Sequence, residues 1–216
     1  MTTLCIVRHG ETDWNRLGRF QGREDIELNE NGRAQASLIA EHLSEFQWDL
    51  IITSPLKRAH ATAEIIGKRL EITKIIEDKA FVERDFGKGS GLTLESQKSA
   101  FPDGDIPGKE NDDALEKRVF RGLQGVIESN RDRKIVIVAH GAVINALLRV
   151  VSAGSIDLGE TNIKNTCINI LEHDGSCWQI KTYNSVAYLK NSDRLQYYTH
   201  QHNNCSILNC QTSIDR

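Results

Sequence analysis

The sequence predicts an α/β fold, because short apolar runs alternate with amphipathic segments along most of the chain. The runs at Thr3–Val7, Leu50–Thr53 and Lys134–Ala139 have the length and the β-branched content of buried strands. The segments between them carry apolar residues at the three- and four-residue spacing of helices. Strands that alternate with helices are typical of a largely parallel sheet with helices packed against it.

The individual elements follow from the local pattern. A helix is expected after Asn29-Glu30-Asn31-Gly32, and a second one from Ser54-Pro55, where proline is tolerated in the first turn. Their expected apolar faces are Ala34, Leu38, Ile39, Leu43 and Phe46 in the first helix, and Ala59, Ala63, Ile66 and Leu70 in the second. The remaining expected elements are an edge strand at Ile72–Ile76, helices at Ala114–Ser129 and Ala142–Val151, and a hairpin of Cys167–Leu171 with Trp178–Tyr183 around HDGS.

Two stretches lack this regular pattern. The segment Phe86–Asp113 holds two of the three prolines and many glycines, so we expect a long loop with a turn or two of helix. Such loops over an α/β sheet usually carry function. After Leu189 the chain becomes polar and rich in asparagine, which predicts a poorly packed tail. Without repeats or an internal linker, we expect a single domain over residues 1–216, with the tail from about residue 190.

The composition argues against several classes of protein. The 216 residues carry a formal net charge of −3, so a global basic field for nucleic acid is absent and an anion has to be bound by a local cluster. The apolar runs are far shorter than a membrane span, and we expect no signal peptide. The five cysteines, an odd number without a C-x-x-C pair, fit a reducing cytoplasm better than a disulfide framework. We therefore expect a cytoplasmic protein that binds neither nucleic acid nor membranes.

Chemically reactive residues occur at four junctions, where an expected strand gives way to a helix or loop. The four junctions are Arg8-His9-Gly10 within IVRHGETDWN, Thr53-Ser54-Pro55-Leu56-Lys57-Arg58, Val82-Glu83-Arg84, and His140-Gly141. In open α/β sheets, ligands bind at the carboxyl ends of the strands. If the strands are parallel, the four junctions converge there and form one pocket.

The converging set favours a phosphate over a metal ion. The guanidinium groups of Arg8 and Arg58 would repel a cation, but they match phosphate oxygens bidentately. A histidine within such a cluster can act as a nucleophile, and a glutamate can protonate the leaving oxygen provided that its pKa is raised toward neutrality. For that glutamate, Glu83 competes with Glu77 and Glu95, and the residues alone leave the choice open.

Five segments together resemble the histidine phosphatase superfamily, in its phosphoglycerate mutase-like branch and of the broad-specificity phosphatase type. They are LCIVRHGETDWN, RFQG, TSPLKRAHATAE, VERDFG and VAHGAVI, and the resemblance covers about Thr3 to Leu189. It implies a three-layer α/β/α sandwich with a mostly parallel central sheet and helices on both faces. It also implies His9 as the phosphorylated nucleophile and Glu83 as general acid and then general base. The resemblance implies no metal and no cofactor, and its phosphate-binding residues are Arg8, Asn15, Gln21, Gly22, Arg58, His140 and Gly141.

The sequence departs from the usual family pattern at two places that bear on leaving-group preference. Gly89-Ser90-Gly91 stands where relatives commonly have tryptophan, glutamate and glycine, and Glu27-Leu28-Asn29 where many have proline, leucine and threonine. Trp14 and Phe20 either line the pocket or have a packing role. A second motif, formed by His200, His202, Cys205 and Cys210, matches no standard zinc spacing and is expected in the polar tail.

The predicted function is metal-independent hydrolysis of small phosphorylated metabolites through a phosphohistidine. The alternatives are a cofactor-dependent phosphoglycerate mutase, a specialised sugar-bisphosphate or α-ribazole phosphatase, and a weak member that only binds phosphorylated partners. Against the mutase, only the 56 residues from 84 to 139 separate Glu83 from His140, and the acidic stretch FPDGDIPGKENDD would disfavour a doubly anionic substrate. The sequence leaves open the physiological substrate and whether the protein forms a homodimer.

Overall fold

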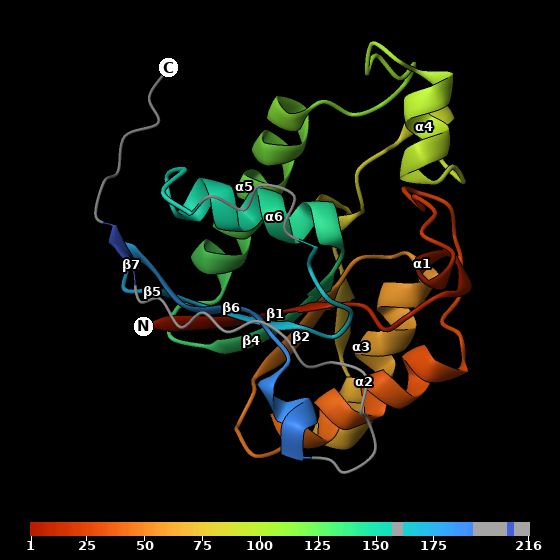
Figure 1. Ribbon diagram of the computed structural model, residues 1–216. Helices are drawn as coiled ribbons and strands as arrows, with labels where there is room; N and C mark the ends of the chain where they lie inside the picture. The colour runs from red at the N-terminus through yellow and green to blue at the C-terminus, as the bar shows by residue number, and fades with distance from the viewer. Residues whose placement is uncertain (157–161, 192–206, 210–216) are drawn as a thin grey trace.

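The computed structural model describes residues 1–156, 162–191 and 207–209, and its strands and helices alternate along the chain (Figure 1). The strands are β1 (Thr2–Arg8), β2 (Leu50–Thr53), β3 (Ile75–Glu77), β4 (Lys134–Ala139), β5 (Ile168–His173), β6 (Trp178–Ser185) and β7 (Ile207–Asn209). The α-helices are α1 (Asp13–Arg16), α2 (Glu30–Leu43), α3 (Lys57–Leu70), α4 (Leu94–Ala100), α5 (Asp112–Ser129) and α6 (Gly141–Val151). The 3₁₀-helices are η1 (Lys79–Phe81), η2 (Gly87–Gly89) and η3 (Ala187–Asn191).

The strands form one sheet in the order β3-β2-β4-β1-β5-β6-β7. Strands β3, β2, β4 and β1 run parallel to one another, and the register places β4 between β1 and β2. Strands β5, β6 and β7 are each antiparallel to the preceding strand in the sheet. The predicted mostly parallel sheet is therefore confirmed, with the expected hairpin added at one edge.

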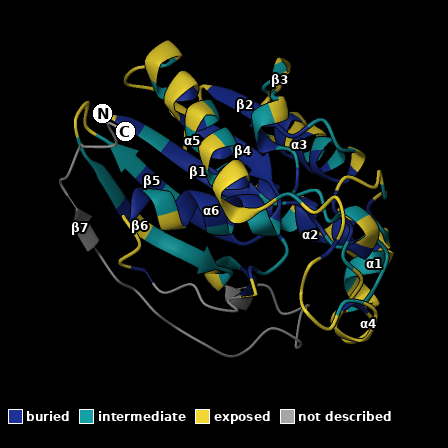
Figure 2. Cartoon of the chain, turned by 90° about the horizontal axis from the view of Figure 1, so that it is seen from above, coloured by how far each residue is buried: buried dark blue, intermediate teal, exposed yellow. Residues whose placement is uncertain are grey.

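Helices cover both faces of the sheet, which confirms the three-layer sandwich. Helices α5 and α6 lie on one face, and α2 and α3 lie on the other (Figure 1). The central strands are buried, whereas the outer face of α5 is exposed (Figure 2). Each face has its own core, led by Leu4, Ile6, Leu115, Ile137 and Leu147 on the α5–α6 side, and by Val7, Ile39, Ile51, Ile66 and Val138 on the α2–α3 side. Each such side chain stabilises the fold by about 1.5–3 kcal/mol.

The expected apolar face of α2 is partly wrong. The helix ends at Leu43, so Phe46 lies beyond it and is 52% exposed, and Ala34 is also exposed. The buried face instead begins with the small or polar residues Gly32, Gln35 and Ala36. The pattern of hydrophobic residues did not predict which side of α2 faces the core. The reason is that the first turn of α2 buries small residues, which let it approach the turn after β1 closely.

The boundaries of β3 and α3 are among those that differ from the expected ones. Strand β3 covers Ile75–Glu77 rather than Ile72–Ile76. Pro55 precedes α3 rather than lying in its first turn, since Leu56 is the N-cap residue. Within Phe86–Asp113, η2 and α4 supply the expected short helical turns.

The cysteines fall into two groups within the described chain. Cys5 and Cys167 are free and buried, and burial raises the pKa of both thiols, to about 11 for Cys167. Cys177, in the turn between β5 and β6, is disulfide-bonded, which the odd cysteine count did not lead us to expect.

The expected polar tail falls mostly on residues 192–206 and 210–216, which lie outside the described residues. So do the residues of the second motif: His200, His202, Cys205 and Cys210. Ile207–Asn209 pairs with β6 as strand β7, which the polar pattern did not predict. Among the helices of the described chain, none has both the length and the apolar character needed to cross a membrane.

Candidate active site

Three parallel strands end side by side and position the first part of the site. Arg8 lies opposite Ala139 in the β1–β4 pairing, and Thr53 lies opposite Val138 in the β2–β4 pairing. The residues that follow these strands therefore lie together: His9, Ser54 and His140. The imidazole rings of the two histidines have centroids 5.2 Å apart. These junctions converge at the carboxyl ends of the strands, as the sequence predicts.

His9 is buried and is oriented through its Nδ1 atom. It is 2% exposed, and Nδ1 lies 2.7 Å from the carbonyl oxygen of Gly10. Because a carbonyl only accepts, Nδ1 carries the proton and Nε2 keeps its lone pair. Burial, and after it the charges of Arg58 and Arg8, lowers the pKa of His9 well below its ordinary value, against the opposing effect of the Gly10 hydrogen bond. His9 is therefore a neutral imidazole at neutral pH.

The turn after His9 depends on two glycines whose backbones touch. A Cβ at Gly10 would lie 2.3 Å from the carbonyl oxygen of Gly32, and a Cβ at Gly32 would lie 2.0 Å from the carbonyl oxygen of Glu11. The Gly10 N–H donates to Thr62 Oγ1 on α3 at 3.1 Å. The two glycines thus allow the His9 turn to rest on the first turn of α2 while α3 holds it from the other side.

His140 is the N-cap residue of α6 and is fully buried. Its Nε2 lies 2.8 Å from Ser54 Oγ, and its Nδ1 is without a hydrogen-bond partner among the described residues. Burial, and after it the charge of Arg58, lowers the pKa of His140 well below its ordinary value. If the Ser54 hydroxyl donates to Nε2, Nδ1 carries the proton of the neutral ring and can donate it to an anion.

Arg58 is the second residue of α3 and is 1% exposed. Its Nη1 donates to the carbonyl of Glu24 at 2.7 Å, and its Nη2 donates to the carbonyl of Gly22 at 2.8 Å. Gly22 adopts a φ of +53°, so the Gln21-Gly22 loop presents its carbonyl to Arg58. Burial lowers the pKa of Arg58 to about 10, with the charge of Glu83 acting in the opposite direction. Within the described chain, Nε of Arg58 and Oε1 of Gln21 are buried without a partner.

Arg8 completes the cationic side of the site. Its guanidinium group donates to the carbonyl of Ile163, and it lies against Gly141, where a Cβ would be 3.8 Å from Arg8 Nε. The charge of Arg8 contributes to lowering the pKa values of His9 and Arg58, although burial is the larger cause for both. Arg8 therefore lies within electrostatic reach of both groups.

Glu83 reaches the cluster from an irregular segment rather than from the end of a strand. Strand β3 ends at Glu77 and η1 intervenes, so the expected junction directly after a strand is wrong. The Glu83 carboxylate accepts from the N–H of Arg84 at 2.8 Å and from the N–H of Ala142 at 3.4 Å. Since Ala142 lies two residues after His140, these contacts place the mostly buried carboxylate beside the histidines.

The two competing glutamates occupy exposed positions. Glu77 lies at the end of β3 with Oε1 3.3 Å from Nε2 of His60, and Glu95 lies in the first turn of α4. Of the three candidates, Glu83 is the one whose contacts lead into the histidine–arginine cluster.

Both aromatic candidates make packing contacts. The ring of Phe20 lies 4.8 Å from the ring of Phe86, measured between centroids. The indole of Trp14 lies so close to Gly91 that a Cβ there would be 3.3 Å from it. These contacts agree with packing, the second of the two roles considered for them.

Asn165 is a site residue that the sequence did not reveal. Its Nδ2 donates to the carbonyl of His9 at 2.9 Å and to Oδ1 of Asn15 at 3.3 Å. Oδ1 of Asn15 also accepts from the backbone N–H and the hydroxyl of Thr12, within the capping box of α1. The Asn15 amide oxygen is therefore occupied, and its NH₂ group is the end that can donate to a ligand. Asn165 carries no motif, and only the fold places it beside the His9 turn.

Two carboxylates of the acidic stretch at residues 101–113 are paired with arginines. The Glu110 carboxylate accepts from Nε and Nη2 of Arg118 at 2.9 and 2.8 Å, and Asp112 forms an ion pair with Arg84. Each of the two carboxylates is thus neutralised by an arginine. The expectation that the net negative charge of this stretch disfavours a doubly anionic substrate stays a prediction, in which Glu110 and Asp112 are each offset by an arginine.

The assembled groups suit an oxyanion. An unsatisfied buried donor costs about 1–3 kcal/mol and calls for an explanation, which an anion in the site would supply for Nε of Arg58, and for Nδ1 of His140 in the tautomer that carries its proton there. Across the described residues, the side chains that could hold a metal do not gather in groups of three or more. Two arginines, two neutral histidines and one carboxylate can together bind a phosphoryl group and move a proton.

Known proteins with similar sequences agree with this chemistry. The family model for the histidine phosphatase superfamily (branch 1) matches residues 4–186. PhoE of Bacillus subtilis (strain 168), an uncharacterized phosphatase, is 43% identical over 189 residues, which are 88% of this chain and 97% of PhoE. A metal-independent phosphoserine phosphatase of Arabidopsis thaliana is 32% identical over 210 residues, which are 91% of this chain and 87% of the relative.

Solved structures show the same fold. YhfR of Bacillus stearothermophilus superposes with a TM-score of 0.81 at 26% identity, covering 88% of this chain and 100% of YhfR. A mutant phosphoserine phosphatase of Entamoeba histolytica, in complex with phosphoserine, superposes with a TM-score of 0.77 at 28% identity. The superposition covers 88% of this chain and 100% of the Entamoeba chain. With a family match across residues 4–186, which include the four junctions, the chain belongs to the histidine phosphatase superfamily and is a phosphatase with a histidine nucleophile.

Proposed function

We propose that this phosphatase hydrolyses small phosphomonoesters through a phosphohistidine at His9 and without a metal ion. The observation that carries the proposal is the buried, neutral His9, whose Nδ1 is held by Gly10 so that Nε2 is available for attack. Arg8 and Arg58 supply the positive charge that a metal ion supplies to phosphate in other enzymes.

Turnover consists of two displacements at phosphorus. First, Nε2 of His9 attacks in line, a phosphorus–nitrogen bond forms, and the bond to the ester oxygen breaks while Glu83 gives its proton to that oxygen. Then Glu83 takes a proton from water, the water oxygen attacks phosphorus, and the phosphorus–nitrogen bond breaks to release phosphate and neutral His9. Arg8, Arg58 and His140 bind the equatorial oxygens, where charge accumulates.

The other predicted residues complete the phosphate site in this proposal. Asn15 donates through its NH₂ group, whose orientation is set by Thr12 and Asn165. The Gln21-Gly22 loop aligns Arg58 through the carbonyl of Gly22. Gly141 begins the 11-residue helix α6, whose N-terminus favours negative charge.

Phosphoserine is the first substrate to test, because several relatives are named phosphoserine phosphatases. We expect free phosphate and little isomerisation of 3-phosphoglycerate, since the short segment between Glu83 and His140 leaves the phosphohistidine open to water. An enolase-coupled assay primed with 2,3-bisphosphoglycerate distinguishes the two activities. Isomerisation that outpaces phosphate release would favour the mutase. The single domain, the cytoplasmic location and the homodimer remain predictions.

The decisive test traps the intermediate. Wild-type protein mixed with ³²P-labelled phosphoserine and denatured within milliseconds should retain label that is labile in acid and stable in base, as a phosphoramidate is. The His9→Ala variant should retain none, and EDTA should change neither labelling nor turnover. An acid-stable adduct, or activity that EDTA removes and a divalent cation restores, would overturn the proposal.

A further inference from the structure

The proposed proton donor lies in a part of the chain without regular structure. Residues 82–85, between η1 and η2, belong to no helix or strand. A general acid has to lie within hydrogen-bond reach of the leaving oxygen. Sheet register, which positions the histidines, does not extend to Glu83. The position of Glu83 depends on the hydrogen bonds of its own segment, among them those from the N–H groups of Arg84 and Ala142 to its carboxylate and that from the N–H of Glu110 to the carbonyl of Asp85. The inference that follows rests on the proposed role of Glu83.

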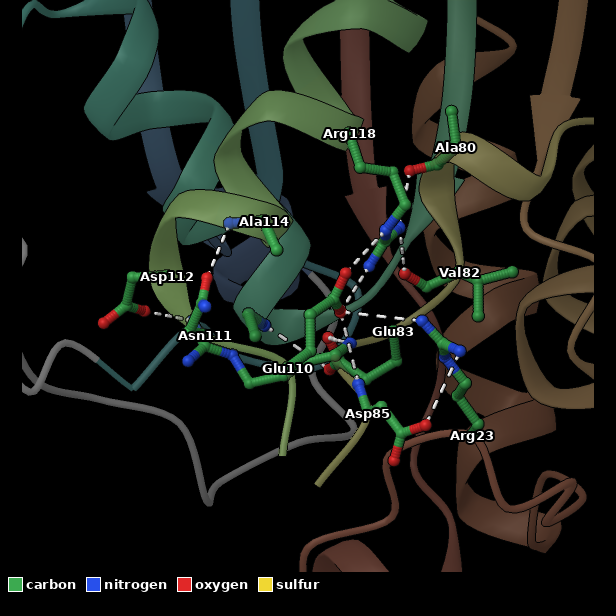
Figure 3. Close-up of polar contacts among 12 residues, drawn as sticks. Arg23, Ala80, Val82, Glu83, Asp85, Glu110, Asn111, Asp112, Ala114 and Arg118 are labelled. Atoms are coloured by element: carbon green, nitrogen blue, oxygen red, sulfur yellow. Dashed lines mark hydrogen bonds and ion pairs between the residues drawn. The ribbon is translucent and has the colours of Figure 1, made fainter. Parts of the chain in front are cut away.

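Arg118, on α5, holds the backbone that leads into Glu83. Its Nη1 donates to the carbonyl of Ala80 and to the carbonyl of Val82, both at 2.8 Å. The Val82 carbonyl belongs to the peptide bond that joins Val82 to Glu83, so this contact orients the plane from which the Glu83 side chain departs. Figure 3 shows Arg118 reaching both carbonyls from the helix.

Glu110 binds the other edge of the same guanidinium group. Its two carboxylate oxygens accept from Nε and Nη2 of Arg118 in a forked pair, and the Glu110 side chain is only 11% exposed. Four of the five N–H donors of Arg118 are thereby engaged. Burial acts to raise the pKa of Glu110, but the hydrogen bonds and charge of Arg118 hold it below its ordinary value. Glu110 is therefore ionised when Arg118 is in place.

Glu110 also connects Arg118 to the loop that aligns Arg58. Nη2 of Arg23 lies 3.7 Å from Glu110, and Nη1 of Arg23 lies 3.5 Å from Asp85. Arg23 directly follows Gly22, whose carbonyl accepts from Arg58. In Figure 3, Glu110 lies between Arg118 and Arg23, close to Glu83. The Glu110 carboxylate thus connects helix α5, the segment that carries Glu83, and the Gln21-Gly22 loop that is followed by Arg23.

We propose that Glu110 and Arg118 form a positioning pair for Glu83, in which Arg118 orients the Glu83 backbone and Glu110 cancels the charge of Arg118 next to it. The charge of Arg118 reaches the site, since it contributes to the lowered pKa of His140 after burial and nearer charges. An uncompensated Arg118 would favour the ionised form of Glu83 and so remove the proton that the leaving oxygen needs. Together, Arg118 and Glu110 therefore orient the Glu83 backbone without adding a net positive charge that would favour the ionised form of the Glu83 carboxyl.

The test is the pH dependence of kcat/KM for an alkyl phosphate, whose leaving group requires a proton. In the proposed mechanism, loss of the proton from the general acid sets the alkaline limb of this profile. Glu110→Gln leaves the charge of Arg118 uncompensated, so the limb should move to lower pH by about one unit. Arg118→Gln leaves Glu110 uncompensated, so the limb should move to higher pH by about as much. It should also lower kcat roughly tenfold, because the backbone contacts are lost.

The double variant Glu110→Gln/Arg118→Gln separates the two roles. Its alkaline limb should return close to the wild-type position, while kcat stays as low as in Arg118→Gln. A purely structural ion pair would not give opposite shifts that cancel. The other charged and titratable groups around Glu83 are the same in all these variants: Arg58, whose charge interacts with that of Glu83, Arg8 and the neutral His9 and His140 of the same cluster, Arg23 with its partner Asp85, and Arg84 with its partner Asp112.

The matched control is the pair Arg69–Glu41, a forked pair of the same chemistry that joins α3 to α2. Arg69 follows Arg58 by eleven residues on α3, about 16 Å along the helix axis. Glu41→Gln should leave both the limb and kcat unchanged. If Arg118→Gln does not fold, as judged by thermal melting, Arg118→Lys replaces it. The lysine keeps the charge and loses the fork, so kcat should fall with the limb in place.

The outcomes distinguish this inference from the proposed function. Limbs that stay in place, or that move in the same direction in Glu110→Gln and Arg118→Gln, would overturn the pair's role alone, provided that Glu83→Gln removes the alkaline limb. A Glu83→Gln variant that keeps the limb would show that Glu83 is not the acid, and the proposed function would then be at fault first.

Discussion

The two sides of the active site are held in place in different ways. The side proposed to receive the phosphoryl group is built on sheet register, since His9 and His140 follow adjacent parallel strands and Arg58 follows the next. The side that carries Glu83 belongs to no strand or helix. Its irregular segment is held by Arg118, which donates to the carbonyls of Ala80 and Val82, and by Glu110, which pairs with Arg118 and donates its backbone N–H to the carbonyl of Asp85.

The difference matches what each side has to do. A nucleophile needs a neutral, desolvated imidazole at a fixed distance from phosphorus, and strand pairing provides both burial and position. A general acid has to gain and lose a proton in every turnover, so its electrostatic surroundings need to be finely balanced. We therefore expect substitutions on the sheet side to abolish activity and substitutions on the loop side to tune it.

The largest expected effect is that of His9→Ala on the sheet side. Removing the nucleophile should lower kcat by about 10⁴-fold or more, as in other covalent enzymes. Single-turnover phosphate release measures the loss. His60→Ala, which removes a more exposed histidine on α3, is the control and should retain wild-type activity. If His9→Ala retained more than a few per cent of the wild-type activity, His9 would not be the nucleophile. The contrast between the sheet side and the loop side would then not hold.

The next effect is on the loop side and depends on the substrate. Glu83→Gln should lower kcat for an alkyl phosphate by about 10²–10⁴-fold, and less for p-nitrophenyl phosphate, whose leaving group needs no proton. Glu77→Gln, at the exposed competing position, should have no effect. Equal losses on both substrates would show that Glu83 does not act as an acid.

A third prediction concerns the stability of the sheet side against pH. The lowered pKa values of His9 and His140 mean that the folded state binds fewer protons than the unfolded state below about pH 6.5. The free energy of unfolding should therefore fall as the pH drops below that value, by up to about 3 kcal/mol per pH unit for the two groups. Urea titrations between pH 7.5 and 5.0 measure the slope, which His140→Asn should reduce. A slope that His140→Asn leaves unchanged would contradict the assignment.

The smallest expected effect probes the contact between the strand ends themselves. Ser54→Ala removes the hydroxyl that lies 2.8 Å from Nε2 of His140, which leaves the orientation of that ring less defined. Loss of one hydrogen bond corresponds to about 0.5–1.5 kcal/mol, so kcat/KM should fall roughly two- to tenfold. Ser37→Ala, on the exposed face of α2, serves as the control. A loss as large as that of His9→Ala would mean that the sheet alone does not set the position of His140.

Local patterns in the sequence determined most of the sheet side. The apolar runs that form β1, β2 and β4 are recognisable because a buried strand needs β-branched and aliphatic residues without interruption. If these strands are parallel, the residues at their ends have to meet, so the sequence itself groups Arg8, His9 and His140. Arg58 joined them because it lies in the first turn of the following helix.

The tertiary structure alone decided what depends on contacts between distant segments. Asn165 lies 156 residues after His9 yet donates to its carbonyl, and Arg118 contacts Val82 across 36 residues of chain. The charge pattern shows Glu110 as one negative charge of an acidic stretch, because a sequence shows a carboxylate but not the arginine that neutralises it. Strand and helix patterns are local consequences of side-chain size and polarity, whereas hydrogen bonds and ion pairs depend on distances of a few ångströms that only the complete fold determines.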